Sequence, residues 1–486
     1  MALTDPELRR PHGWALLTWE RPRPDSIRTR PWAWRLAVAT VCFGAFMGQL
    51  DASIVTLTYQ ALRNQFHTPL AAVQWVSLAY MLALVALLIP VGRMSDAHGR
   101  KLVYLYGFAL FTAASAACGL APTLGLLIVF RVVQAAGAAM LQANSVALVT
   151  TSAPPGKMRA ALGMQAAGQA IGLALGPTIG GALVDTIGWR WVFGINVPVG
   201  IAALIAGHYL LPRTRQRTGG NRIDPPGVLL LAGSTTALLL ALSVASGLGL
   251  PQWAAAALLV LAVGAGWAFV RRQARCASPL VDLALLRTGG ISPGLFGGLC
   301  GYLVLFGPLV LVPVGLARQG IGALQAGLVL TALPVGFAVA ATLADRVLPP
   351  DWGNRARSRA GTVGCVVALA LMALLPLREA LLPGPLALLG LALGVFLPAN
   401  NTAVMRAIPA AAAGTGGGMV NMTRGLGTAL GVAAVTLTLH LVQGAAGIAT
   451  AFAVLTGCAL LALATVARRP DGGGPDGRAP AVPLDR

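Results

Sequence analysis

Charged side chains are scarce in this sequence of 486 residues. Asp, Glu, Lys and Arg make up 10% of it, whereas they form roughly a quarter of a soluble domain. Hydrophobic residues reach 56%, and the mean hydropathy is +0.75. This composition excludes a soluble globular protein. The 60 glycines and 32 prolines follow no three-residue period, which excludes a collagen-like chain. The sequence therefore predicts a polytopic, all-α membrane protein.

Cysteine and histidine are also rare, with six and five residues respectively. None of them shows the CxxC or His-paired spacing of a zinc or iron–sulfur site. The GxxxxGKS/T loop of nucleotide-driven pumps is absent from the sequence. We therefore expect no metal, no cofactor and no primary pump. The dispersed histidines and the lack of paired acids also argue against a membrane-embedded enzyme.

Long apolar runs, by contrast, fill the chain. A membrane-spanning helix needs about 20 apolar residues, and fourteen such segments are bounded by charges or by Pro and Gly clusters. The predicted spans are 36–58, 71–92, 102–121, 123–147, 160–185, 191–211, 227–248, 253–270, 295–316, 324–343, 361–377, 386–405, 415–440 and 446–467.

The basic residues are distributed unevenly between the connections. With the N-terminus inside, 29 of the 35 Lys and Arg fall on the inner side, four fall outside and two lie within spans. Basic residues favour the cytoplasmic side of a membrane. We therefore expect a multi-pass protein of the cell membrane with both termini cytoplasmic. Since the net charge of +20 is spread over eight short segments, we expect no nucleic-acid partner.

An internal repeat relates the two ends of the chain. Gly163-Met164 recurs 255 residues later as Gly418-Met419, and GLALG at 172–176 recurs as GTALG at 427–431. At nearly the same offset, Asp96 and Arg100 correspond to Asp351 and Arg355. Parallel repeats of this kind form the halves of some transporters. The predicted organisation is a cytoplasmic tail (1–35), a six-helix half (36–211), a linker with two extra helices (212–291), a second six-helix half (292–467) and a cytoplasmic tail (468–486).

Among the acidic residues, Asp51 alone lies deep inside a predicted span. At 1.5 Å per residue it lies about 22 Å from the inner edge, and Arg131 of the fourth span lies about 18 Å from it. The two side chains can therefore pair if these spans face each other. Burial favours the neutral carboxyl group and a nearby cation favours the carboxylate, which suits reversible protonation. A static bridge that only orders the bundle is the alternative.

The second and third spans are joined by the turn Gly92–Lys101, with sequence GRMSDAHGRK. Glycine permits a tight turn, and Asp96 can approach a helix N-terminus, which the start of the thirteenth span near Thr415 would offer. A solvated charged turn is the alternative interpretation. The candidate gate residues in this turn are Gly92, Asp96, Gly99, Arg100 and Lys101.

The fifth span carries glycines at four-residue spacing around Pro177. Such spacing flattens one helix face so that a neighbour packs closely, and proline permits a bend. Plain packing and a gating hinge both fit this pattern. The residues concerned are Gly168, Gly172, Gly176, Pro177, Gly180 and Gly181. Polar side chains inside the spans are possible substrate contacts, namely Gln134, Gln169, Asn421 and Arg424. For Arg424, an anionic substrate and a role as a helix anchor are equally open.

Several motifs in order resemble those of the major facilitator superfamily, in particular its fourteen-helix drug:proton antiporters. They are the turn Gly92–Lys101, RVVQAAG at 131–137, GLALGPTIGG at 172–181, LDASIV at 50–55 and WRWVFGINVPVG at 189–200. The resemblance implies the major facilitator fold. It also implies that Asp51 carries the exchanged proton, that Arg131 assists its transfer, and that Asp96 and Arg100 lock the halves together on the cytoplasmic side.

The function predicted on this basis is proton-coupled export of amphipathic drugs or of a natural product across the cell membrane. A proton-coupled uptake symporter for a small metabolite is the alternative, and the Gly-Pro motif at 176–177 argues against it. The expected partners are a small-molecule substrate, protons and the lipid bilayer. We expect the protein to be a monomer.

The charge asymmetry predicts the topology of the chain. Reporter domains fused after Gly219 and after Arg469 should both be active in the cytoplasm, and one fused after Gly249 should be active outside, because basic connections stay on the cytoplasmic side. Paired cytoplasmic and periplasmic reporters measure this directly. An external signal after Gly219 would contradict the count of fourteen spans.

Overall fold

A computed structural model describes residues 20–28, 30–154, 156–214, 224–245, 251–276, 278–287, 290–321, 323–375, 378–442 and 444–467. Within these ranges the regular structure is helical, which confirms the predicted all-α class. The fusion positions Gly219, Gly249 and Arg469 lie outside the described residues. The helices are α1 (Asp25–Arg28), α2 (Ala33–Ile54), α3 (Tyr59–Phe66), α4 (Leu70–His98), α5 (Arg100–Gly119), α6 (Leu124–Ser152), α7 (Met158–Thr186), α8 (Arg190–Gly194), α9 (Asn196–Leu210), α10 (Pro225–Ala245), α11 (Gln252–Gln273), α12 (Leu283–Arg287), α13 (Ile291–Ala317), α14 (Ala323–Leu330), α15 (Ala332–Val347), α16 (Asn354–Leu374), α17 (Pro383–Ala407), α18 (Ala413–Leu441) and α19 (Gly444–Ala467).

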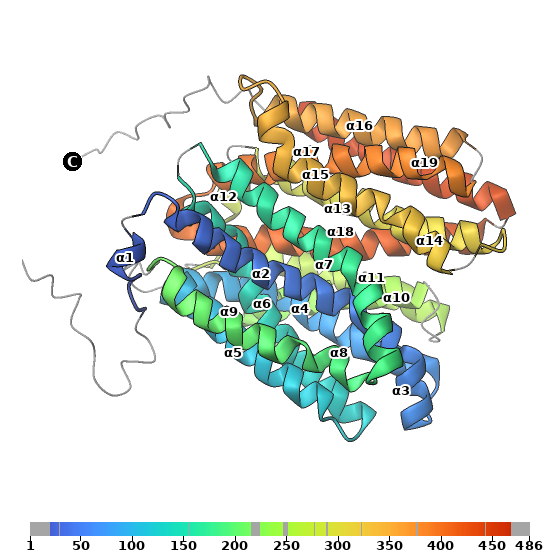
Figure 1. Ribbon diagram of the computed structural model, residues 1–486, viewed down its shortest axis with the longest axis horizontal. Coiled ribbons are helices and arrows are strands. Elements are labelled where there is room, and N and C mark those ends of the chain that lie inside the picture. The colour runs from blue at the N-terminus through green and yellow to red at the C-terminus, as the bar shows by residue number, and fades with distance from the viewer. Residues whose placement is uncertain are drawn as a thin grey trace, which may run out of the picture.

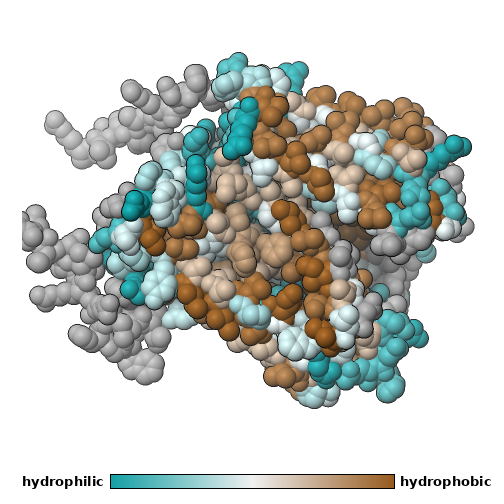
Figure 2. Space-filling model, viewed as in Figure 1, coloured by the Kyte–Doolittle hydropathy of each residue, from teal (hydrophilic) through white to brown (hydrophobic). Residues whose placement is uncertain are grey.

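The long helices are those of a multi-pass membrane protein. Thirteen helical segments of the described chain are long and apolar enough to cross a bilayer, and α7, with 29 residues, corresponds to the fifth predicted span. Large apolar side chains such as Val129, Val260 and Leu328 are exposed on the outside of the bundle. Figure 2 shows hydrophobic residues over the middle of the molecule and hydrophilic residues at both ends. This is the distribution that a hydrocarbon layer selects.

The helices form two bundles that lie side by side (Figure 1). In the first, α5 packs on α6, α2 on α7, and α4 on α6. In the second, α15 and α16 pack on α17, and α13 packs on α18. The bundles meet where α18 packs against α4 and α6, and where α7 packs against α15 and α17. The helices α4, α6, α7, α15, α17 and α18 therefore form the interface between the halves.

Repeat-related glycines bring these interface helices into close contact. A Cβ atom at Gly163 of α7 would overlap the carbonyl oxygen of Ala341 on α15. Its counterpart 255 residues later is Gly418 of α18, where a Cβ atom would come within 2.6 Å of the carbonyl oxygen of Leu88 on α4. Small residues allow such close approach of helix backbones. The internal repeat seen in the sequence thus corresponds to two equivalent contacts between the halves.

The inserted helices α10 and α11 pack on each other and lie against one side of the bundle. Helix α10 contacts α4 and α18, with Leu239 in one apolar cluster with Leu82 and Val85 of α4. At the end of the hairpin, Arg272 donates hydrogen bonds to Asp224 at 2.6 and 3.0 Å. These bonds lower the pKa of the Asp224 carboxyl group, so the pair stays ionised at neutral pH. The domain boundaries proposed from the sequence remain predictions.

The position of α10 predicts which cysteine pairs can be crosslinked. In a background without the six native cysteines, cysteines at Leu239 and Leu82 should react with a short bifunctional reagent, because both side chains belong to one cluster. A pair at Leu239 and Gly172 should not react, because α7 packs against α2 and α15 instead. The mobility of the crosslinked band in gel electrophoresis measures the yield. Efficient crosslinking between Leu239 and Gly172 would place the insert inside the core.

Candidate functional site

A buried carboxylate, Asp51 near the end of α2, forms the centre of the first polar cluster. Its side chain is 0% exposed. The Oδ2 atom accepts a hydrogen bond from Nη1 of Arg131 at 2.6 Å, and Oδ1 accepts from Gln134 and Asn196 at 3.0 Å each. The structure therefore brings Asp51 and Arg131 together, at the similar depths that their positions along the chain predict.

Arg131 of α6 is enclosed on all sides and is 1% exposed. Its Nε atom donates to the carbonyl oxygen of Val76 on α4 at 3.2 Å, and Nη1 also donates to Gln134 at 2.6 Å. Its guanidinium carbon lies 4.0 Å from the centre of the Tyr80 ring, a distance at which a cation interacts favourably with an aromatic face. The ion pair is thus held by α2, α4 and α6 together.

Two further amide side chains belong to this cluster. Gln134 donates to Asp51 and to Ser115 of α5, and its role as a substrate contact stays a prediction. Asn196, the first residue of α9, has no predicted role although it lies in the motif at 189–200. Its position after the short helix α8 turns its side-chain amide toward Asp51. The signals in the sequence were this motif and an amide at the start of an apolar run.

The glycine motif of α7 packs against the helix that carries Asp51. Cβ atoms at Gly172 and Gly176 would collide with Phe46 and Ser53 of α2, and one at Gly180 would meet side chains of the same segment. A Cβ atom at Gly181 would have open space. Pro177 lies within α7, and its side chain is outside the described residues. The motif therefore sets the spacing between α7 and α2, and with it the environment of Asp51.

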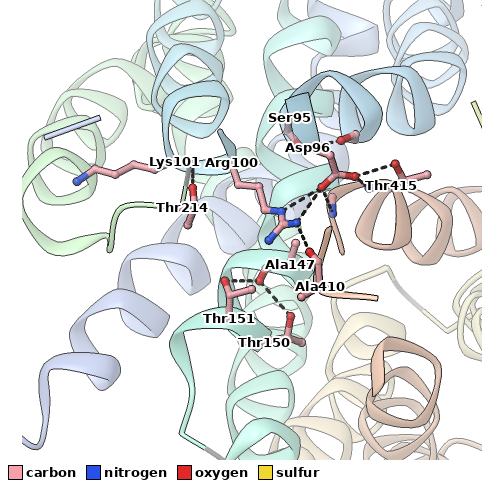
Figure 3. A network of polar contacts seen from close by, with 12 residues as sticks. Ser95, Asp96, Arg100, Lys101, Ala147, Thr150, Thr151, Thr214, Ala410 and Thr415 are labelled. Atoms are coloured by element: carbon pink, nitrogen blue, oxygen red, sulfur yellow. Dashed lines mark hydrogen bonds and ion pairs between the residues drawn. The ribbon is translucent and has the colours of Figure 1, made fainter. Parts of the chain in front are cut away.

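A second polar cluster joins the halves at the end of the bundle that carries Asp96, called here the Asp96 end. Asp96 of α4 accepts hydrogen bonds from the backbone amides of Gly414 and Thr415 at 2.7 and 2.8 Å, and from the Thr415 hydroxyl at 2.8 Å (Figure 3). Both amides belong to the first turn of α18, where free N–H groups and the helix dipole favour an anion. This is the helix start that the sequence suggested.

The basic residues that follow Asp96 bind different partners. Arg100 donates to Asp96 at 2.9 Å and to the carbonyl oxygen of Ala410 at 2.5 Å. Lys101 is buried, and its ammonium group donates to the carbonyl oxygens of Arg21, His208 and Leu211 at 2.8 to 2.9 Å. Arg100 therefore contributes to the contact between halves, whereas Lys101 ties the N-terminal segment to the end of α9.

Glycines shape the turn around Asp96. A Cβ atom at Gly92 would lie 2.5 Å from the carbonyl oxygen of Gly414, so only glycine allows α4 and α18 to approach here. Gly99 has a φ angle of 102°, a conformation that side-chain-bearing residues rarely adopt. It lets α5 begin immediately after α4.

A third polar cluster also joins the halves at the Asp96 end, where α7 meets α15. Arg159 of α7 donates to Asp345 of α15 at 2.6 Å and to Asn354 at 3.2 Å, and the buried Arg357 donates to Asp345 at 2.8 Å. Asp345 lies two residues before the end of α15, as Asp96 lies two residues before the end of α4.

This arrangement corrects the correspondence of Asp96 with Asp351, and it gives Arg355 a different partner from that of Arg100. Asp351 is exposed, and Arg355 donates to the carbonyl oxygen of Ala467. Asp345 occupies the equivalent place in the fold. The constant offset fails because Gly99 alone separates α4 from α5, whereas residues 348–353 separate α15 from α16. The longer connection changes the offset of the residues before it, such as Asp96 and Asp345. The offset of the residues after it stays the same.

Arg424 and Asn421 of α18 contact the first half through Gln142 of α6. Nη2 of Arg424 donates to Oε1 of Gln142, and the Asn421 amide donates to the Gln142 carbonyl oxygen at 2.7 Å. Gln169 of α7 is half-buried and, within the described part of the chain, forms no hydrogen bond with the other predicted contacts. Arg424 and Asn421 therefore form one cluster, separate from Gln134 and Gln169.

These clusters are suited to proton binding and to ion pairing. A carboxylate that accepts hydrogen bonds from Arg131, Gln134 and Asn196 can exchange those contacts for a proton. In the described ranges, no three His, Cys, Asp or Glu side chains gather in a way that could hold a metal ion.

Comparison with known proteins assigns the chain to a family. Residues 41–432 match the Major Facilitator Superfamily. The chain is 32% identical over 412 residues to the "Tetracenomycin C resistance and export protein" of Streptomyces glaucescens, covering 84% of this chain and 76% of the relative. It is 30% identical over 401 residues to the "Riboflavin transporter RibZ" of Clostridioides difficile (strain 630), covering 82% and 86% of the two chains.

A solved structure supports the same fold. The human organic anion transporter MFSD10 (TETRAN) superposes with a TM-score of 0.67 at 17% identity, over 90% of this chain and 100% of that one. At this identity the likeness concerns the fold alone. The long family match and the two relatives carry the assignment. The chain belongs to the Major Facilitator Superfamily and is a multi-pass membrane transporter rather than an enzyme.

Proposed function

We propose that this transporter is a proton-coupled antiporter that exports amphipathic drugs or a natural product across the cell membrane. A relative named as an antibiotic resistance and export protein supports the direction of transport. The excess of basic residues in the even-numbered connections supports a cytoplasmic location for the Asp96 end and for both termini. In this proposal the protein works as a monomer within the bilayer.

The observation that carries the proposal is the placement of Asp51. An ionisable group inside a membrane span is costly and points to a functional role. Asp51 is fully buried and its carboxylate is bound by Arg131, Gln134 and Asn196. A group that alternates between a proton and such partners is what proton exchange requires.

Protonation of Asp51 would change the balance of forces around it. A neutral carboxyl group loses most of its attraction for Arg131, whose charge would then be buried without a counter-ion. A rearrangement that gives Arg131 water or another partner becomes favourable. Because Gly172 and Gly176 pack α7 directly on α2, a movement of α2 would be passed to α7 and so to the interface between the halves.

The contacts at the Asp96 end would regulate access from the cytoplasm. Asp96 binds the first turn of α18, and Arg159 binds Asp345. Both contacts join the two halves, so both must break before a substrate can enter from that side. In this proposal the structure represents a state closed toward the cytoplasm, and its two closures correspond to the equivalent positions of the repeat.

Uptake of a small metabolite with protons is the second candidate. The observation in its favour is the relative named as a riboflavin transporter. The glycine motif of α7, which resembles that of antiporters, argues against it. The direction of the proton-driven flux in vesicles separates the two candidates.

The Asp96 contact predicts a shift in conformation. Asp96→Asn should favour the state open to the cytoplasm, because a neutral amide binds the positive end of α18 less well than a carboxylate. A cysteine replacing the buried Ala147, which lies beside Gly417 of α18, should then react with maleimide about threefold faster or more. The exposed Asp351→Asn is the matched control and should leave the rate unchanged. Equal rates in all three proteins would mean that Asp96 does not hold the interface closed.

Asp51 predicts a loss of coupling. In proteoliposomes with an imposed pH gradient, Asp51→Asn should abolish driven efflux of a compound first selected by drug susceptibility in a pump-deficient host, because the amide cannot take up a proton. Asp51→Glu should retain partial efflux, and Asp351→Asn should behave like the wild type. Fluorescence or radiolabel efflux gives the rates. Wild-type pumping by Asp51→Asn would show that the proton route lies elsewhere.

A further inference from the structure

Arg424 differs from the other buried arginines in the group that it binds. Four arginines are buried in the described part of the chain, namely Arg100, Arg131, Arg357 and Arg424. The first three each bind a carboxylate, at 2.9, 2.6 and 2.8 Å. Within the same ranges, the one hydrogen bond that Arg424 makes goes to the neutral amide of Gln142, although its side chain lies mid-way along α18 and is only 6% exposed. A buried cation without a counter-ion is costly.

Within the described residues, Arg424 forms no ion pair with an acidic side chain. Its helix packs closely on α13, since a Cβ atom at Gly427 would lie 2.9 Å from Tyr302, and Tyr80 of α4 lies in one apolar cluster with Met419 and Val420 of α18. The Tyr80 hydroxyl is buried, and among the described residues it has no hydrogen-bond partner. A buried hydroxyl left without a partner is uncommon in a folded protein. The site therefore has a positive charge and a free donor, and what it lacks is an anion that could accept from both.

The site also lies between the two halves of the protein. Tyr80 and Gln142 belong to the first half, and Arg424 and Tyr302 belong to the second. Their helices pack on one another, because α18 contacts α4, α6 and α13. A ligand held there would touch both halves, so its binding and release would be linked to their relative movement.

We propose that Arg424 and Tyr80 bind the anionic group of the exported molecule, which makes the substrate an amphipathic organic anion that bears a carboxylate or sulfonate. This inference rests on the proposed export function and names its substrate class. A guanidinium group binds such anions through parallel N–H donors. The Tyr80 hydroxyl supplies a further donor, and Gln142 holds the guanidinium in place from the first half.

Tyr80 also connects this site with Asp51. Its ring covers the guanidinium of Arg131 at 4.0 Å, and Arg131 binds Asp51 at 2.6 Å. A change in the anion at Arg424 therefore reaches the proton site through one side chain. This gives substrate and proton a short physical path by which each can affect the other.

The test compares two probes that share an aromatic skeleton and differ in charge, anilinonaphthalene sulfonate and neutral N-phenylnaphthylamine. Equilibrium dialysis against the protein in phosphatidylcholine nanodiscs, corrected with empty nanodiscs, gives both affinities. We expect the sulfonate to bind about tenfold more tightly than its neutral analogue. Arg424→Gln should lose about tenfold in sulfonate affinity, as expected for a charge-assisted hydrogen bond, with little change for the neutral probe. Tyr80→Phe should lose about threefold.

Two further variants separate binding from a structural role. Arg424→Lys should keep the preference for the sulfonate because it keeps the charge. Gln142→Glu should abolish that preference although Arg424 remains, because a carboxylate of the protein would then neutralise it. If Arg424 served only to join the helices, Gln142→Glu would strengthen that link and leave sulfonate binding intact. The exposed Arg406→Gln is the matched control and should behave like the wild type.

The outcomes are decisive in both directions. Absence of a sulfonate preference in the wild type, or a sulfonate affinity unchanged in Arg424→Gln, would overturn the proposal. Competition by added phosphatidylglycerol would assign the site to a lipid headgroup and overturn it as well. These measurements are made at equilibrium without a pH gradient. A failure of proton-driven export would therefore leave them standing, and a failure of anion selectivity would leave proton-driven export standing.

Discussion

The ion pair between Asp51 and Arg131 is the constraint on which the first half depends. In hydrocarbon neither charge can turn to water, so each must find its partners within the protein. Asp51 comes from α2 and its direct partners from α6 and α9. Gln134 extends the network to Ser115 of α5, and Arg131 extends it to the α4 backbone. Five helices are therefore positioned relative to one carboxylate.

Close packing at glycine complements this polar core. Glycines related by the internal repeat make equivalent contacts in the two halves. Gly172 lies against Phe46 of α2, and Gly427 lies against Leu299 of α13. Apolar side chains gain little from leaving lipid for another helix, so helices in a membrane associate through fit and backbone proximity. The polar network determines which helices of the first half are neighbours. In both halves, the glycines determine how closely neighbouring helices approach.

Features that depend on spacing within one helix could be predicted from the sequence. The depths of Asp51 and Arg131 follow from a fixed rise per residue, and the basic turn after Asp96 follows from its neighbours in the chain. The contact of Asp96 with the start of α18 was also expected, but other contacts between distant helices were not. The pair Arg159–Asp345 was missed because the longer connection after α15 shifts the repeat. Asn196 was not predicted as a partner of Asp51, because the motif at 189–200 does not show which of its side chains faces another helix.

The two contacts that close the Asp96 end differ in how they respond to dissolved ions. Asp96 is buried and bound by backbone amides, whereas the side chains of Arg159 and Asp345 are 24% and 26% exposed. The Debye length at physiological ionic strength is about 8 Å, and screening acts far more on exposed pairs than on buried ones. Salt therefore weakens the ion pair between α7 and α15 more than the contact of Asp96 with α18. At rising ionic strength the halves would therefore separate first where α7 meets α15, while the contact of α4 with α18 would hold longer.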